Sequence, residues 1–188
     1  MPLIRWAAVI SIPILMFTNY YLTLLGKKYG DNVYLQHFTS EQYSAWQEKI
    51  NKFKLNYKHV LYIILITGYF YFASLLLKDS WFDLIFGALF SFYAYIIMRN
   101  CSHILTYKFA NKNPDQLTGK IIYGHIFSIK STQYHAFTRG IFLLFLFGWT
   151  RSWFLLGGAG ALLLFSLAQI RHINAYKKKM KAKNQPPA

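Results

Sequence analysis

Long apolar segments, each about the length of a helix that crosses a bilayer, constrain this chain more than any other feature of its sequence. A membrane-spanning helix needs about 20 mostly apolar residues. Residues 6–25, 59–77 and 81–98 meet this requirement. Pro13 lies inside the first segment, and membrane helices tolerate proline because neighbouring groups satisfy the freed backbone oxygen. That segment continues without a small-residue cleavage site, so we expect a retained span and not a signal peptide.

The last apolar region, residues 139–170, is too long for one span and carries Arg151 in its middle. A charge at the centre of a bilayer costs several kcal/mol. Two spans, near 132–149 and 153–171, avoid this cost if a tight turn at Arg151 joins them. The sequence therefore predicts an all-α, polytopic helical bundle of five spans. The alternative is four spans, with the last apolar region partly re-entrant.

The positions of the basic residues test the five-span arrangement independently of hydropathy, because cytoplasmic loops collect Lys and Arg. In chain order, the segments outside the spans or at their ends carry one, six, one, six, one and six basic residues, which accounts for all 21 Lys and Arg. Only an odd number of spans gives this alternation. The pattern predicts an N-terminus outside and a C-terminus in the cytoplasm, and we expect a bacterial inner membrane protein.

The charge balance points to anionic lipids as partners. The 21 Lys and Arg face only 6 Asp and Glu, which gives a net charge of +15. Each basic residue near an anionic leaflet contributes about 1 kcal/mol of attraction, so a nucleic-acid partner is not needed to explain the charge. Few carboxylates, no glycine-rich phosphate loop and no G-x-S-x-G motif argue against nucleotide and hydrolase chemistry.

The first long loop contains a predicted amphipathic helix over about residues 40–53. Thr39 and Gln42 form a capping box that starts it. Apolar side chains then recur on one face at helical spacing, namely Tyr43, Trp46, Ile50 and Phe53. We expect this helix to anchor in the inner interface or to pack on the protein's own loops.

The second long loop breaks at Asn113-Pro114, which is a turn signal. The Ile-rich stretch after this turn is predicted to be a short strand, a hairpin or extended chain. Beyond the last span, residues 177–188 are basic and then proline-rich, so we expect a disordered tail. Residues 1–176 form a single predicted transmembrane domain.

A polar face follows the third span and carries the strongest candidate binding residues. Arg99, His103 and Tyr107 are four residues apart and share one side of a helix. An arginine can hold a phosphate with two parallel hydrogen bonds, and a histidine adds a donor. The alternative is that Arg99 only reaches to the interface and ends the span. The predicted lipid- or anion-binding set also includes Asn100, Lys130 and Arg139.

Two further patterns concern packing and metals. Small residues in the third and last spans predict close helix contacts, within one chain or in a homo-oligomer; they are Gly87, Ser91, Gly157 and Ala161. All six histidines lie in the cytoplasmic segments or near the inner ends of spans. They lack the spacings H-x-x-H, H-x-x-x-H and H-E-x-x-H, so the sequence predicts no metal site and no cofactor.

The residues together predict a non-enzymatic integral membrane protein. Its basic cytoplasmic face is expected to bind anionic lipid headgroups or a cytosolic protein. Two alternatives stay open at this point. One is an oligomeric channel or transport subunit, and the other is a small membrane enzyme acting on a lipid at the inner leaflet.

Overall fold

The structure is a computed structural model that describes residues 3–30, 38–40, 57–113, 121–123 and 125–183. These residues form five long helices and two strands of three residues each. The helices are α1 (Leu3–Gly30), α4 (Tyr57–Leu76), α5 (Asp79–Lys112), α6 (His125–Thr150) and α7 (Trp153–Lys183). The expectation of a helical chain is therefore confirmed.

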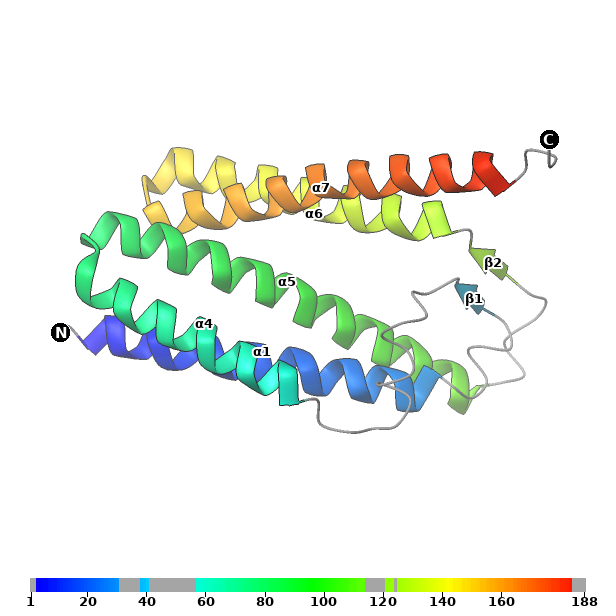
Figure 1. The fold of residues 1–188 in the computed structure, drawn as a ribbon, viewed down its shortest axis with the longest axis horizontal. Coiled ribbons are helices and arrows are strands. Elements are labelled where there is room, and N and C mark those ends of the chain that lie inside the picture. The colour runs from blue at the N-terminus through cyan, green and yellow to red at the C-terminus, as the bar shows by residue number, and fades with distance from the viewer. Residues whose placement is uncertain (1–2, 31–37, 41–56, 114–120, 124, 184–188) are drawn as a thin grey trace.

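Consecutive helices run in opposite directions along one long axis (Figure 1). The start of α1, the α4–α5 turn and the α6–α7 turn lie at one end of the bundle, and the end of α7 lies at the other. The turns are short, because only residues 77–78 and 151–152 separate the helices there. The predicted break in the last apolar region is present at Arg151, so this region forms two helices.

Among the described residues, four helices are long and apolar enough to span a membrane. They contain the segments Arg5–Gly26, His59–Leu76, Asp79–Lys112 and Trp153–Lys177. Helix α6, which contains the predicted fourth span, is not one of the four. Polar side chains interrupt its apolar residues, among them Lys130, Gln133 and Arg139.

The helices extend beyond the predicted spans. Helix α5 continues to Lys112, α6 begins at His125, and α7 continues to Lys183. The reason is that apolar side chains mark only the part of a helix that suits a bilayer. Backbone hydrogen bonds between residues four apart continue regardless of side-chain polarity. Part of the segment predicted to be a disordered tail is thus helical up to Lys183.

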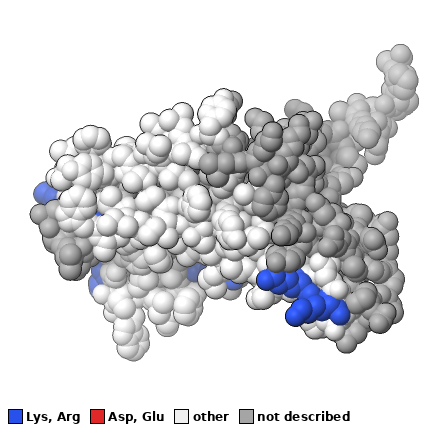
Figure 2. Space-filling model, turned by 90° about the horizontal axis from the view of Figure 1, so that it is seen from below, with Lys and Arg blue, Asp and Glu red and all other residues white. Residues whose placement is uncertain are grey.

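The outside of the bundle is apolar along its middle. Ile14, Leu65, Phe145 and Leu164 are 58–69% exposed, and they come from four different helices. Figure 2 shows a mostly white region between Lys and Arg atoms that lie towards the two ends. Apolar surface on this scale is foreign to soluble monomers and suits contact with lipid tails.

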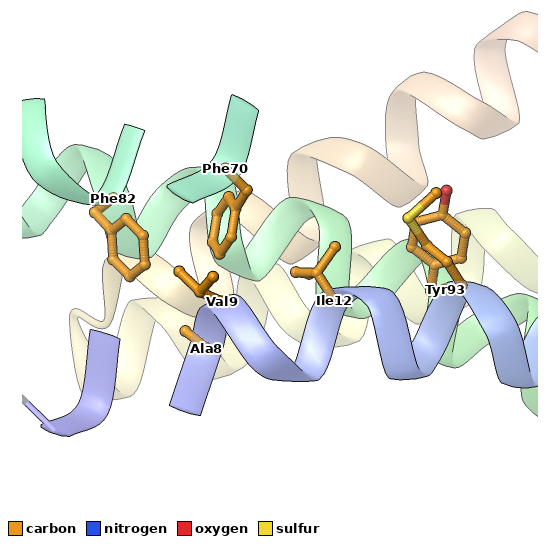
Figure 3. Packing of buried hydrophobic residues seen from close by; sticks show 7 residues of the cluster. Ala8, Val9, Ile12, Phe70, Phe82 and Tyr93 are labelled. Atoms are coloured by element: carbon orange, nitrogen blue, oxygen red, sulfur yellow. The ribbon is translucent and has the colours of Figure 1, made fainter. Parts of the chain in front are cut away.

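Two groups of buried side chains hold the helices together. The larger group joins α1, α4 and α5 through residues such as Val9, Ile12, Phe70 and Phe82 (Figure 3). The Phe70 and Phe82 rings are stacked, with centroids 5.0 Å apart. The smaller group joins α5, α6 and α7 and is made of Tyr95, Ala136 and Leu162. Helix α5 belongs to both groups, so it is the central element of the fold.

Helices α5 and α7 approach each other closely through glycines. A Cβ atom at Gly87 would overlap the backbone carbonyl of Phe154, and one at Gly157 would overlap that of Leu84. A Cβ at Gly158 would likewise overlap the Ser91 hydroxyl. Ala161 lies one turn further along α7 and is partly buried. These small residues therefore serve a contact within one chain.

The two strands lie at the end of the bundle opposite the short turns (Figure 1). β1 (Phe38–Ser40) pairs in parallel with β2 (Ile121–Tyr123), with Thr39 opposite Ile122. This ladder connects the segment after α1 to the segment before α6. The strand that the Ile-rich stretch allowed is thus present, and its partner comes from the other long connection.

Candidate functional site

The end of the bundle that carries the short turns also carries four tryptophans, and we call it the tryptophan end. Trp6, Trp81, Trp149 and Trp153 come from α1, α5, α6 and α7 and are 44–84% exposed. Tryptophan is enriched at the headgroup level of membranes, because its ring is apolar and its N–H needs a polar partner. Four such rings at one level are typical of a membrane interface.

One cation of the tryptophan end, Arg5, has its partners inside the chain. The Arg5 guanidinium forms an ion pair with Asp79 and donates hydrogen bonds to the carbonyl oxygens of Ser74 and Leu77, the latter at 3.0 Å. It also lies over the Phe82 ring, 5.0 Å from the centroid. Arg5 thereby caps the last turn of α4, where backbone oxygens lack partners within the helix. This arginine is a structural residue that attaches α1 to the α4–α5 turn.

The opposite end, which we call the basic end, is different. We define it by the basic residues from Arg99 to Lys177 whose side chains the structure describes, except Arg151: Arg99, Lys108, Lys112, Lys130, Arg139, Arg171 and Lys177. The carboxylates of the described residues are Asp79 and Asp83, and both lie in the first turns of α5 at the tryptophan end. Leaving Lys108 aside, no cation of the basic end forms an ion pair within the described part of the chain.

An arginine of α6 contacts a tyrosine of α5, and a second arginine lies one turn from that tyrosine on α5. The Arg139 guanidinium of α6 lies over the Tyr95 ring of α5, 5.0 Å from its centroid. Arg99 follows Tyr95 by four residues on α5, and the charges of Arg99 and Arg139 both act on the Tyr95 hydroxyl. That hydroxyl donates to the backbone oxygen of Thr132 on α6 at 3.1 Å. Tyr95 is 2% exposed, so its contact with Arg139 reaches into the interior of the bundle.

One hydrogen-bond donor of the Arg99 side chain lacks a partner among the described residues. Its Nε atom is buried and has no hydrogen-bond partner among the described residues. The rest of the side chain is only partly exposed, as is that of Arg139. Moving a cation partly out of water costs hydration free energy. No carboxylate of the described residues offsets this cost at Arg99. The geometry therefore suits an anion held between α5 and α6.

The other predicted binding residues lie in three different places. His103 and Tyr107 continue the helix side of Arg99, with ring centroids 6.0 Å apart. Lys130 is exposed on the second turn of α6. Asn100 donates instead to the Asn19 side-chain oxygen at 3.0 Å and to the Thr23 hydroxyl at 3.4 Å, both on α1. Successive residues on a helix differ by 100° in direction, so Asn100 belongs to the α1–α5 contact and not to the Arg99 side.

Tyr95 is the residue that sequence reasoning missed. The i, i+4 row that linked Arg99 to His103 and Tyr107 also extends one turn backwards to Tyr95. That position lies within the predicted apolar span, where an aromatic side chain is expected for packing alone. Its contact with Arg139 depends on how α6 folds back along the bundle.

Other predicted features give no further site in the described residues. His59 stacks on Tyr20 with ring centroids 4.3 Å apart, and its buried Nε2 has no described hydrogen-bond partner. No three His, Cys, Asp or Glu side chains of the described ranges come together in a way that could hold a metal ion. The predicted anchor residues Tyr43, Trp46, Ile50 and Phe53 lie outside the described residues.

Comparison with known proteins gives this chain no relative. No protein family, no curated protein and no solved structure matches it.

Proposed function

We propose that this chain is a five-span integral membrane protein whose basic end binds anionic lipid headgroups of the cytoplasmic leaflet. The observation that carries the proposal is the unequal treatment of charge at the two ends of the bundle. Arg5 at the tryptophan end has a carboxylate, two backbone oxygens and an aromatic ring as partners. Arg99, Arg139 and the other described cations of the basic end, Lys108 aside, have no carboxylate partner within the described ranges.

The orientation follows from the same contrast. The described residues of the tryptophan end include few cations, of which Arg5, Lys78 and Arg151 lie at the start of α1 and at the two short turns. Ends with few cations face away from the cytoplasm, and ends with many cations remain on the cytoplasmic side. We therefore place the N-terminus outside and the C-terminus inside, in the inner membrane of a bacterium.

Helix α6 is the fifth span in this proposal, although it is less apolar than the others. Trp149 lies in the last turn of α6, beside the α6–α7 turn, and is 84% exposed. Most polar side chains of α6 precede Gly140, and the residues from Ile141 to Trp149 are apolar apart from Gly148. Arg139 lies against Tyr95 in the bundle interior, which lowers the cost of a charge at this depth.

Lipid binding is tested with the purified chain in nanodiscs of phosphatidylcholine containing increasing fractions of phosphatidylglycerol. We expect phosphatidylglycerol to raise the thermal stability and to remain bound in native mass spectrometry. The double variant Lys108→Glu, Lys112→Glu should weaken this preference, because it reverses two exposed charges of the basic end. The matched control Lys78→Glu reverses an exposed charge at the tryptophan end and should leave it unchanged. Equal stability in both lipids would contradict the proposal.

Orientation is tested separately with reporter fusions at both chain ends in a bacterial host. A reporter active only in the cytoplasm should be active at the C-terminus and inactive at the N-terminus. Two ends on the same side would show an even number of spans and would remove the basis for placing the basic end at the inner leaflet.

A further inference from the structure

Arg99 and Arg139 form the one described place where two cations from different helices face a shared side chain inside the bundle. The exposed lysines of the basic end can attract a lipid surface without any fixed geometry. The two arginines differ because their side chains are partly buried. Arg139 lies over the Tyr95 ring, and Arg99 lies one helical turn from Tyr95 on α5. Guanidinium groups are also weakly hydrated and planar, so they suit enclosed sites in which one anion is held with two parallel hydrogen bonds.

The surroundings of the pair favour a phosphate group over a carboxylate of a peptide. The buried Arg99 Nε offers a donor without a described partner, and Arg139 offers further donors from the neighbouring helix. A phosphate presents its acceptor oxygens in several directions and suits donors on two sides, whereas a carboxylate presents two oxygens in one plane. His103 and Tyr107 continue the same side of α5 towards the basic end, where a headgroup would extend.

The lateral position fits a ligand that comes from the membrane. Helix α5 diverges from α6 and α7 towards the basic end (Figure 1). Phe142, three residues after Arg139 on α6 and thus on a neighbouring side of the helix, is 60% exposed, so apolar surface that suits acyl chains lies near Arg139. A phospholipid could therefore place its phosphate at the arginines and its acyl chains on the outside of α6.

We infer that Arg99, Arg139 and Tyr95 form a specific site between α5 and α6 for the phosphate of one anionic ligand. The two arginines hold the phosphate oxygens, and Tyr95 positions Arg139 beneath them. The inference deepens the proposed function and rests on it for the orientation of the basic end. The phosphate is supplied by a phospholipid headgroup or by a free phosphate compound, and the experiment separates these two sources.

The test measures binding to the full chain in a neutral maltoside detergent by native mass spectrometry and thermal shift. Three probes are titrated: phosphatidylglycerol, glycerol 3-phosphate and inorganic phosphate. We expect Arg99→Gln and Arg139→Gln each to weaken the tightest phosphatidylglycerol binding by at least about tenfold, because each removes charge-assisted hydrogen bonds. The double variant should lose little more than either single variant, because both arginines hold the same ligand.

Matched variants keep the result interpretable. Lys108→Gln and Arg171→Gln remove exposed charges from the basic end and should leave the tightest binding within about twofold. Arg99→Lys and Arg139→Lys keep the charge and lose the planar fork. They should fold like the wild type, as judged by gel filtration and tryptophan fluorescence, and still bind weakly.

The outcomes separate this inference from the proposed function. Binding of phosphatidylglycerol that depends on the arginines supports a lipid site, and arginine-dependent binding of the two soluble probes alone supports a free phosphate ligand and overturns the lipid proposal. Phosphatidylglycerol binding that weakens equally in the arginine and lysine variants supports only the general attraction of the basic end and overturns the specific site. Additive losses in the double variant would also overturn it, because they would place the arginines at two independent sites.

Discussion

The two ends of this bundle treat positive charge in opposite ways. At the tryptophan end, Arg5 is fixed by Asp79, by two backbone oxygens and by the Phe82 ring. At the basic end, Arg99 has a buried nitrogen without a described partner, and Arg139 contacts an aromatic ring. An arginine that has its partners within the fold stabilises the fold. An arginine without them costs free energy until something else supplies the anion.

The same contrast extends to packing. Near the tryptophan end, α5 and α7 meet backbone to backbone at Gly87 and Gly157. Towards the basic end, α5 diverges from α6 and α7 (Figure 1). We conclude that the tryptophan end holds the bundle together, whereas the basic end is the place for contact with other molecules. Four measurements test this difference between the two ends.

We expect the greatest loss of stability from a substitution at the glycine contact between α5 and α7. Gly157→Ala should lower the free energy of unfolding by about 3 kcal/mol, because the added Cβ overlaps the Leu84 carbonyl and forces α5 and α7 apart. Equilibrium unfolding in mixed detergent measures this change. The control is Gly160→Ala on the same helix, where a Cβ meets no atom within 4 Å and should be neutral or slightly stabilising. Equal effects of the two substitutions would show that the close contact does not determine stability.

The second effect concerns the partnered arginine. Arg5→Met keeps an apolar stem but removes the ion pair and the hydrogen bonds to the end of α4. It should lower the free energy of unfolding by about 2 kcal/mol, because Asp79 and two backbone oxygens then lose their donor. The exposed Arg171 gives the control, and Arg171→Met should change stability little. An Arg5→Met variant as stable as the wild type would show that the Arg5 contacts do not stabilise the tryptophan end.

The third effect should have the opposite sign. In a neutral detergent without anionic lipid, Arg99→Met should leave the free energy of unfolding unchanged or raise it by up to about 1 kcal/mol, because a partly buried cation without a carboxylate costs hydration. The same unfolding assay compares it directly with Arg5→Met. Should Arg99→Met destabilise the chain as much as Arg5→Met does, the contrast between the two ends would be refuted.

The smallest effect is at the α6–α7 turn. Arg151 has a φ of 57°, a left-handed conformation that glycine adopts more easily than any residue with a Cβ. Arg151→Gly should therefore raise the free energy of unfolding by about 0.5 kcal/mol. Ser152→Gly changes the neighbouring residue, which does not have a positive φ, and should give no gain. A loss of stability in Arg151→Gly would indicate that the charge at the tryptophan end has an interaction beyond the turn itself.

Much of the helical arrangement was predictable from the sequence. The apolar runs located α1, α4 and α5, and Arg151 within the last run located the break between α6 and α7. These predictions succeed because a charge is costly in lipid and because a span has a minimum length. The helix ends were less predictable, since hydropathy does not register helices that continue into water.

The candidate site was only partly predictable. The spacing of Arg99 and His103 placed them on one side of a helix, but the same spacing could not assign Asn100, which bonds to Asn19 on α1. Tyr95 was missed because a tyrosine in an apolar run is expected to pack in the core. The pairing of β1 with β2 was also hidden, because the two strands lie in different loops and neither is long enough to give a pattern of its own.

Long apolar helices could be predicted from the amino-acid sequence, and so could the sorting of cations into alternate segments. Both predictions depend on hydropathy and charge, which act locally along the chain. Which cations have partners became clear only from the packing of the helices. Arg5 and Asp79 are paired, and Arg99 and Arg139 share Tyr95, because α1 lies against the α4–α5 turn and α6 folds back beside α5. Such pairings depend on how helices distant in the chain pack together, and no local pattern carries that information.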